Sequence, residues 1–153
     1  KLLSSACGKN GMVYGQFLDI ESESKLIDKK SIENIHSLKT GKLIECSVMF
    51  GQIGNSKKEQ INVLKSYGKK IGLAFQITDD ILEIISNKET LGKSTNSDIK
   101  NQKSTYANVV GIDNAIKKSQ KLSESAIADL ENLNSKEIDM LIELGKYISY
   151  REK

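Results

Sequence analysis

The 153-residue chain contains no proline. Proline fixes φ near −65° and removes a backbone N–H donor, so it usually ends or kinks a helix. Without proline, helices in this chain can continue for many turns. Apolar residues recur at spacings of three and four along most of the sequence, which is the period of an amphipathic helix. Because no segment shows a convincing strand pattern, the sequence predicts an all-α domain.

One segment in the middle of the chain shows this period most clearly. The residues that recur at these spacings are Ile61, Leu64, Gly68, Ile71, Phe75, Thr78 and Leu82. Ser56 and Glu59 precede it with the spacing of a capping box, and the helix is expected to end near Ile85. Other helices are expected at 1–7, 31–48, 104–110, 113–130 and 135–148, with N-caps at Ser31, Ser104, Asp113 and Ser135. Residues 86–102 are polar and predict a long loop, a kind that is often functional.

Charge and cysteine usage narrow the class of protein. The net charge is +3, from 23 basic and 20 acidic residues, which is too balanced to favour a nucleic-acid partner. No apolar run approaches the ~18–20 residues of a membrane span, and the first residues lack the apolar core of a signal peptide. Cys7 and Cys46 lie far apart in the sequence and are typical of reduced thiols in a cytoplasmic protein.

A group of acidic residues ends the central helix. Asp79, Asp80 and Glu83 lie within two turns, and helical spacing predicts that they and Gln76 share one side. Such carboxylates repel one another unless a cation lies between them, and their hard oxygen atoms suit Mg²⁺ bound together with phosphates. The alternative is a solvated acidic helix end, but the apolar residues on both flanks of the group favour a site.

Several lysines could supply the opposite charge. Lys39 and Thr40 fall within an apolar helix, Lys93 lies in the long loop, and Lys103 comes just before a short helix whose N-terminus would favour an anion. A diphosphate between lysines and a magnesium-bound carboxylate group would use both charges. The alternative for each lysine taken alone is a surface charge whose stem lies along apolar surface.

Five short motifs follow one another in a distinctive order. They are GQxxDI at 15–20, KTG at 39–41, FQxxDDILE at 75–83, LGK at 91–93 and KSTY at 103–106. This series resembles the C-terminal half of the trans-isoprenyl diphosphate synthases, or polyprenyl synthetase family, and is most similar to the bacterial farnesyl and geranylgeranyl diphosphate synthases. Glu83 stands where that family usually has a third aspartate. The resemblance covers nearly the whole chain, so 1–153 is expected to be the C-terminal half of that domain, with the N-terminal half missing.

The resemblance implies a fold and a set of site residues. The fold would be the C-terminal part of the isoprenoid-synthase helical bundle. The implied metal ligands are Asp79, Asp80, Glu83 and Asp98. The implied substrate-binding residues are Lys39, Lys93, Lys103 and Gln16, with Asp19 lining the same cavity. Lys39, Thr40 and Gln76 would be catalytic, and His36 would be structural.

The resemblance also implies an activity. A family member uses Mg²⁺ to ionise an allylic diphosphate, and the resulting cation is attacked by isopentenyl diphosphate in a head-to-tail condensation. The intact enzyme is expected to be a cytoplasmic homodimer with no membrane span and no nucleic acid. Because the family's first aspartate-rich motif is absent from this sequence, the chain alone is expected to be inactive or nearly so. Two alternatives are a non-catalytic partner subunit of such an enzyme and a helical scaffold without a ligand.

Overall fold

The computed structural model describes residues 1–54, 57–90, 105–131, 133 and 138–151, with the side chains of 87–90 left out. Every regular element in these ranges is helical, which confirms the predicted all-α class. In chain order the elements are α1 (Leu2–Cys7), α2 (Met12–Glu21), α3 (Lys29–His36), η1 (Ser37–Gly41), α4 (Lys42–Phe50), α5 (Lys58–Thr90), α6 (Tyr106–Val110), α7 (Ile112–Glu131) and α8 (Asp139–Tyr150).

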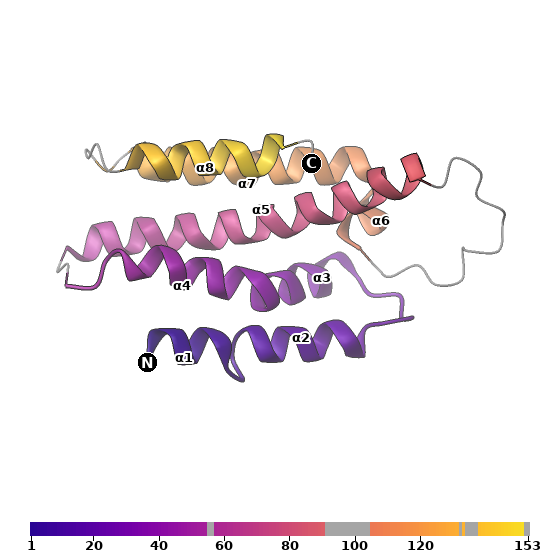
Figure 1. Cartoon of the computed structure of the whole chain (residues 1–153), viewed down its shortest axis with the longest axis horizontal. Helices are drawn as coiled ribbons and strands as arrows, with labels where there is room; N and C mark the ends of the chain where they lie inside the picture. The colour runs from indigo at the N-terminus through magenta and orange to yellow at the C-terminus, as the bar shows by residue number, and fades with distance from the viewer. Residues whose placement is uncertain (55–56, 91–104, 132, 134–137, 152–153) are drawn as a thin grey trace.

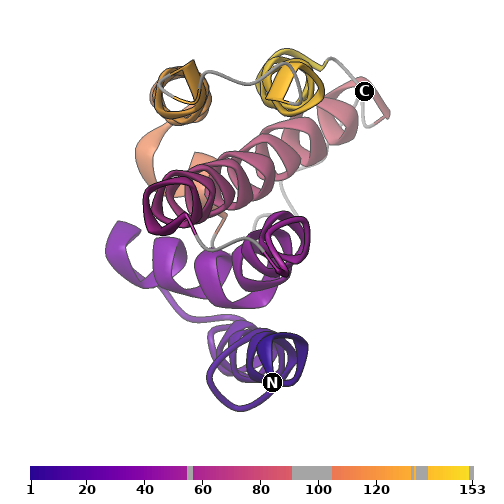
Figure 2. The same cartoon turned by 90° about the vertical axis from the view of Figure 1, so that its left-hand side faces the viewer.

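The 33-residue helix α5 forms the middle of the molecule (Figure 1). It packs against η1 and α4 on one side and against α7 and α8 on the other. Seen end-on, α1 and α2 form a further layer beyond α3 and α4 (Figure 2). One buried cluster joins α5 to α7 and α8, with Tyr67, Ala126 and Leu130 fully enclosed. The Tyr67 hydroxyl donates a hydrogen bond of 2.6 Å to the carbonyl of Leu141, so a polar contact also joins α5 to α8 within this core.

Several helix boundaries differ from the sequence prediction. α5 continues to Thr90 instead of ending near Ile85, because no glycine or proline interrupts that stretch and its residues tolerate a helix. The predicted cap Ser31 is wrong: Asp28 caps α3, and its Oδ1 accepts the Ser31 N–H at 2.8 Å. α6 is capped by Thr105 instead of Ser104. α7 begins at Ile112, one residue before its predicted cap, while Ser56 and Ser135 lie outside the described residues.

The predicted helix at 31–48 contains an irregular segment. Residues 29–50 run without a break from α3 through η1 into α4, but η1 is a π-helix. A π-helical turn is rare and occurs frequently at functional sites, because its wider turn re-aims the side chains around it. η1 holds Lys39 and Thr40, two residues predicted to be catalytic. The apolar period of the sequence gave no signal for this change of helix type.

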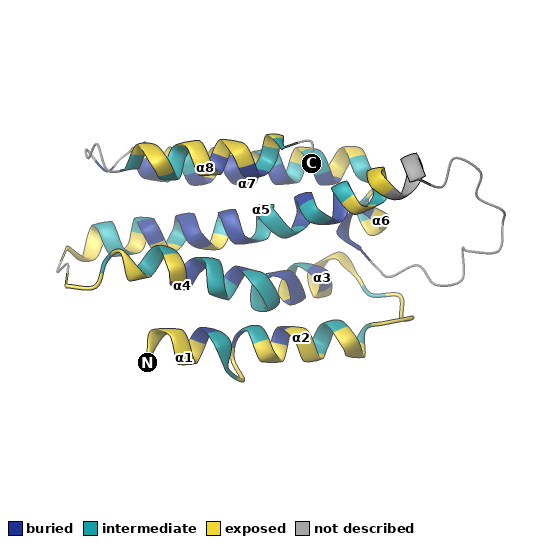
Figure 3. Ribbon diagram, viewed as in Figure 1, coloured by how far each residue is buried: buried dark blue, intermediate teal, exposed yellow. Residues whose placement is uncertain are grey.

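Much of the layer formed by α1 and α2 is exposed (Figure 3). Val13, Phe17 and Ile20 of α2 are each more than half exposed. The rings of Tyr14 and Phe17 stack on this surface, with 6.2 Å between their centroids. Along the parts of the chain that the structure describes, no helix has both the length and the apolar character needed to cross a membrane.

Candidate functional site

Thr40 and Gln76 meet where η1 crosses α5. The Thr40 Oγ1 donates a hydrogen bond of 2.7 Å to the Gln76 Oε1. The two helices can approach this closely because glycines face each other at the crossing: a Cβ on Gly72 would lie 2.6 Å from the Cα of Gly41. Gly72 precedes Gln76 by one turn and Gly41 follows Thr40 directly. The glycine of the KTG motif therefore allows the contact that brings these two predicted catalytic residues together.

Lys39 points to the other neighbouring helix, α2. Its Nζ lies 2.6 Å from the Oδ2 of Asp19, and both side chains are largely buried. A glycine again permits the approach, since a Cβ on Gly15 would lie only 2.2 Å from the backbone N of Lys39. Asp19 is one turn beyond Gly15 on α2, which places its carboxylate beside Lys39. Gln16, predicted to bind substrate, is exposed on the same helix.

Asp79 is held by a residue from the far end of the chain. The Arg151 Nη2 donates a hydrogen bond to the Asp79 Oδ1, and the guanidinium lies over the Phe75 ring at 4.6 Å from its centroid. Phe75 and Asp79 are one turn apart on α5, so Arg151 spans that turn. Burial raises the pKa of the Asp79 carboxyl, and the charge and hydrogen bond of Arg151 oppose this rise.

Asp80 is in a different environment from Asp79. Its side chain is buried, and its Oδ2 accepts the backbone N–H of Tyr106 at 2.6 Å and lies 3.5 Å from the Nε2 of His36. Adjacent residues of an α-helix point about 100° apart, so Asp79 can face α8 while Asp80 faces α3 and α6. The anion at the start of α6 is thus Asp80 itself, in the place where the sequence suggested that a diphosphate would bind.

The three carboxylates of the motif therefore do not form one cluster. Across the described residues, no group of three acidic, histidine or cysteine side chains is close enough to hold a metal ion. Asp79 is partly exposed and Glu83, one turn further along α5, is exposed. Two oxygen-bearing side chains on one face still fit Mg²⁺, which is commonly held by one or two carboxylates together with substrate phosphates. Asp80 lies apart from this pair, in contact with α3 and α6, and its predicted role as a metal ligand stays a prediction.

Three predicted residues cannot be placed, and one contact was missed. Lys93, Asp98 and Lys103 lie outside the described residues. The contact between Arg151 and Asp79 joins positions 72 residues apart, and helical periodicity carries no information about such pairs. The sequence does single out Arg151 in one respect, since it is the sole arginine of a chain with 23 basic residues.

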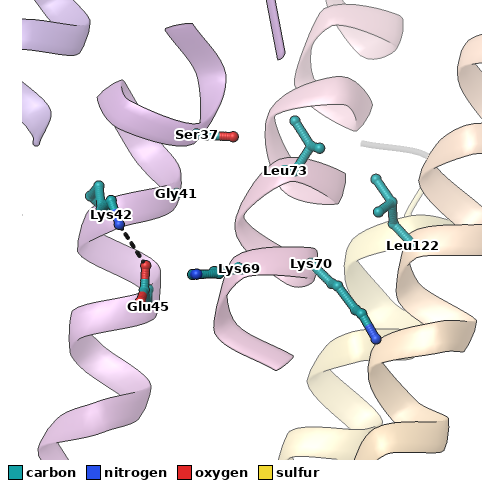
Figure 4. Close-up of a pocket in the computed structure, with 8 residues that line it drawn as sticks. All are labelled: Ser37, Gly41, Lys42, Glu45, Lys69, Lys70, Leu73 and Leu122. Carbon is teal, nitrogen blue, oxygen red and sulfur yellow. Dashed lines mark hydrogen bonds and ion pairs between the residues drawn. The ribbon is translucent and has the colours of Figure 1, made fainter. Parts of the chain in front are cut away.

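A cavity of about 370 Å³ lies on another flank of the crossing between η1 and α5 (Figure 4). Its lining residues are Ser37, Gly41, Lys42, Glu45, Lys69, Lys70, Leu73 and Leu122. None of them belongs to the predicted site. Lys42 and Lys70 are already paired, with Glu45 at 3.1 Å and Asp129 at 2.6 Å. Lys39, Thr40, Gln76, Asp79 and Glu83 therefore remain the candidate site residues, and none of them lines this cavity.

Comparison with known proteins gives consistent results. The model of the family described as Polyprenyl synthetase matches residues 1–144. The chain is 43% identical to a farnesyl diphosphate synthase of Micrococcus luteus and 39% identical to one of Escherichia coli K12, in each case over 99% of this chain and 52% of the relative. A solved structure of geranyltransferase from Helicobacter pylori, complexed with magnesium and isoprenyl diphosphate, superposes with a TM-score of 0.75 at 30% identity, over 96% of this chain and 48% of that one. The chain thus spans about half the length of the proteins that it matches.

Proposed function

The chain belongs to the polyprenyl synthetase family, and we propose that it forms the C-terminal half of a prenyltransferase that condenses isopentenyl diphosphate with an allylic diphosphate. The observation that carries the proposal is the Thr40–Gln76 hydrogen bond, which joins the KTG motif, with its Lys39, to the α5 motif that also bears Asp79 and Glu83. A cation, a hydroxyl–amide pair and two carboxylates are the groups that a magnesium-bound diphosphate needs. No observation favours the alternatives of a non-catalytic subunit or a scaffold.

Each of these residues has a task in the proposed reaction. Asp79 and Glu83 would hold Mg²⁺, which when bound supplies Lewis-acid stabilisation of a departing diphosphate. Lys39 would neutralise charge that develops on the diphosphate oxygens, and Asp19 holds its ammonium group in place until then. The Thr40–Gln76 hydrogen bond would fix two oxygen dipoles near the carbon that becomes cationic. Lys93, Lys103, Asp98 and Gln16 are proposed to complete the diphosphate and metal contacts.

Asp80 has a supporting task in this scheme. Its buried carboxylate binds the first backbone N–H of α6 and lies beside His36. It therefore anchors the start of α6, which follows Lys93, Asp98 and Lys103 in the sequence. We assign Asp80 to the positioning of α6, in place of the direct metal contact expected from the motif.

The remaining features of the proposal concern the whole enzyme. We propose a homodimer in the cytoplasm, a location that fits the free thiols of Cys7 and Cys46. The chain carries one aspartate-rich motif, and the proposed reaction distributes its metals between two. The 153 residues by themselves are therefore expected to bind magnesium diphosphate weakly and to give little product.

The test is a calorimetric titration of the chain with inorganic diphosphate, with and without Mg²⁺. Binding should require Mg²⁺ and should be lost in Asp79→Asn. Asp139→Asn is the matched control, because it removes an exposed carboxylate in the first turn of α8. Equal binding with and without Mg²⁺, or unchanged binding in Asp79→Asn, would contradict the proposed function.

A further inference from the structure

The side chain of Arg151, at the end of α8, is largely buried and contacts two residues of α5. It follows α8 directly, and its backbone N–H donates to the carbonyl of Tyr147 at 2.9 Å. The side chain is only 14% exposed. Its guanidinium lies over Phe75 and its Nη2 donates to Asp79. The Arg151 side chain thus packs against α5 and does not extend into solvent.

A chain of hydrogen bonds fixes the end of α8 beside the acidic motif. The Ser149 Oγ donates to the carbonyl of Ser119 on α7 at 3.3 Å. The Ser119 hydroxyl in turn shares a hydrogen bond of 2.7 Å with the Thr78 hydroxyl on α5. Thr78 directly precedes Asp79, and Ser149 lies two residues before Arg151. Contacts among three helices, one buried and one partly buried, therefore hold the backbone of Arg151 beside that of Asp79.

The contact between Arg151 and Asp79 uses one carboxylate oxygen. The Arg151 Nη2 binds Oδ1, and the Nε of the same guanidinium is buried without a hydrogen-bond partner in the described part of the chain. The pair is therefore not the two-bond fork that arginine often makes with a carboxylate. The other oxygen of Asp79, Oδ2, accepts no hydrogen bond from any residue that the structure describes.

This geometry has a consequence for the cation that Asp79 can hold. We infer that Arg151 is a positioning residue which makes Asp79 a one-oxygen ligand and so favours Mg²⁺ over Ca²⁺ at the site. Ca²⁺ accepts two oxygens from one carboxylate and tolerates six to eight ligands, whereas Mg²⁺ demands octahedral geometry and takes few protein oxygens. The Arg151 hydrogen bond on Oδ1 competes with coordination by both oxygens, so Oδ2 alone is favoured as the ligand, which is the coordination that suits Mg²⁺. The inference rests on the proposed function, because it assumes that Asp79 binds the metal.

The choice of arginine supports this role. The chain has a single arginine and otherwise uses lysine for its basic side chains. A planar guanidinium can lie flat on the Phe75 ring while one of its N–H groups points in a fixed direction. A lysine ammonium has no such plane, so it would leave the direction of its hydrogen bond undefined. The stacking on Phe75 therefore explains how one oxygen, and not both, is held.

The experiment compares metal selectivity in the full chain. Inorganic diphosphate is titrated by calorimetry in the presence of Mg²⁺ or of Ca²⁺, and the ratio of the two affinities is measured. In Arg151→Met, which keeps an unbranched apolar stem over Phe75 but has no donor, we expect the preference for Mg²⁺ to fall about tenfold, the lower end of the effect of outer-shell partners on metal affinity. Lys146→Met is the control, because it removes one charge from the exposed side of α8. A pure charge effect would change both affinities together and leave the ratio unchanged.

Each outcome separates the inference from the proposed function. An unchanged ratio in folded Arg151→Met, with diphosphate still bound, would overturn the role of Arg151 and leave the proposed function standing. A wild-type chain that binds diphosphate with neither metal would overturn both. Circular dichroism establishes whether Arg151→Met folds. If it does not, Phe75→Leu keeps the arginine but removes the ring under it, and a lowered ratio there supports the inference while an unchanged one refutes it.

Discussion

Asp79 and Asp80 are neighbours in the sequence, but their carboxylates bind partners on different helices. Asp79 accepts a hydrogen bond from Arg151 after α8, and Asp80 accepts one from the backbone of Tyr106 in α6. The side chain of Asp79 is 38% exposed and that of Asp80 is 9% exposed. A motif that reads as one acidic group is therefore divided into a half-exposed carboxylate available to a ligand and a buried one that holds the fold.

This division predicts different effects of two adjacent substitutions. In the absence of metal, Asp80→Ala should lower the free energy of unfolding by about 1–3 kcal/mol, because it leaves the buried Tyr106 N–H without a partner. Asp79→Ala should cost at most about 1 kcal/mol, since its ion pair is partly solvated. Urea denaturation of the two variants measures both values. Equal losses would mean that Asp80 is not the structural member of the pair.

The Thr40–Gln76 contact can be tested by a double-mutant cycle. Thr40→Val and Gln76→Leu each remove one partner of the hydrogen bond, and the coupling between them should be about 0.5–1.5 kcal/mol in the free energy of unfolding. Ser47→Ala is a control on the adjoining helix, because within the described residues the Ser47 hydroxyl binds the backbone of its own turn, at the carbonyl of Leu43, at 2.9 Å. Thr40→Val and Ser47→Ala should therefore differ in their coupling to Gln76→Leu. A coupling near zero would show that the hydrogen bond does not hold η1 against α5.

The sequence predicted the helices better than the contacts that individual side chains make. The spacing of apolar residues identified α5 and the all-helical class, because burial imposes that period directly on the sequence. The GQxxDI and KTG motifs marked residues that the structure brings together, as Lys39 lies beside Asp19. Their roles in binding and catalysis stay predictions.

What the sequence did not reveal depends on contacts between distant segments. Spacing alone grouped Asp79 and Asp80 on one side of the helix, whereas these adjacent residues point about 100° apart and contact different neighbouring helices. The π-helix of η1 depends on packing against α2 and α5 and leaves no mark in the period of its residues. The same holds for Arg151, whose position is set by a hydrogen-bond chain through Ser119.

Asp129 predicts an acid-sensitive part of the stability. Burial by itself would raise its pKa, but hydrogen bonds from Lys70 and Ser66 outweigh burial and lower it below the ordinary value of 3.8. A carboxyl whose pKa is lower in the folded state stabilises the fold above its unfolded pKa, and this contribution is lost as the pH falls through the folded pKa. Thermal unfolding from pH 7 down to about pH 2 should show wild type losing more stability than Asp129→Asn. A parallel decline of the two proteins would contradict this assignment, and Asp139→Asn serves as the control.

Lys39 and Lys42 offer a matched comparison within one continuous helix. Lys39 pairs with Asp19 on α2, at the candidate site, and Lys42 pairs with Glu45 on its own helix. If Lys39 contacts a diphosphate, Lys39→Met should weaken binding of magnesium diphosphate about ten- to a hundredfold, the loss of one charged hydrogen bond. Lys42→Met should bind as wild type does. Equal binding by both variants would identify Lys39 as a structural partner of Asp19 only.

The exposed face of α2 predicts association of the chain. Val13, Phe17 and Ile20 follow one another at helical spacing and are 58%, 55% and 56% exposed, and Tyr14 stacks on Phe17. Contiguous apolar surface of this kind on a soluble domain marks a surface that packs against another protein. We therefore expect the purified chain to form dimers or larger species at micromolar concentrations, in a concentration-dependent equilibrium. Light scattering after size-exclusion chromatography measures the mass of each species.

Two variants decide whether this face is responsible. Phe17→Glu combined with Ile20→Glu places charges in the middle of the surface, so association through it should be abolished while the helix itself remains. Leu26→Glu is the control, because Leu26 is fully exposed but lies beyond the end of α2. It adds a charge to the same region without entering the apolar face, and it should associate as wild type does. A wild-type chain that stays monomeric at every concentration would show that this face is stable in water, and association that persists in the double variant would place the interface on another part of the molecule.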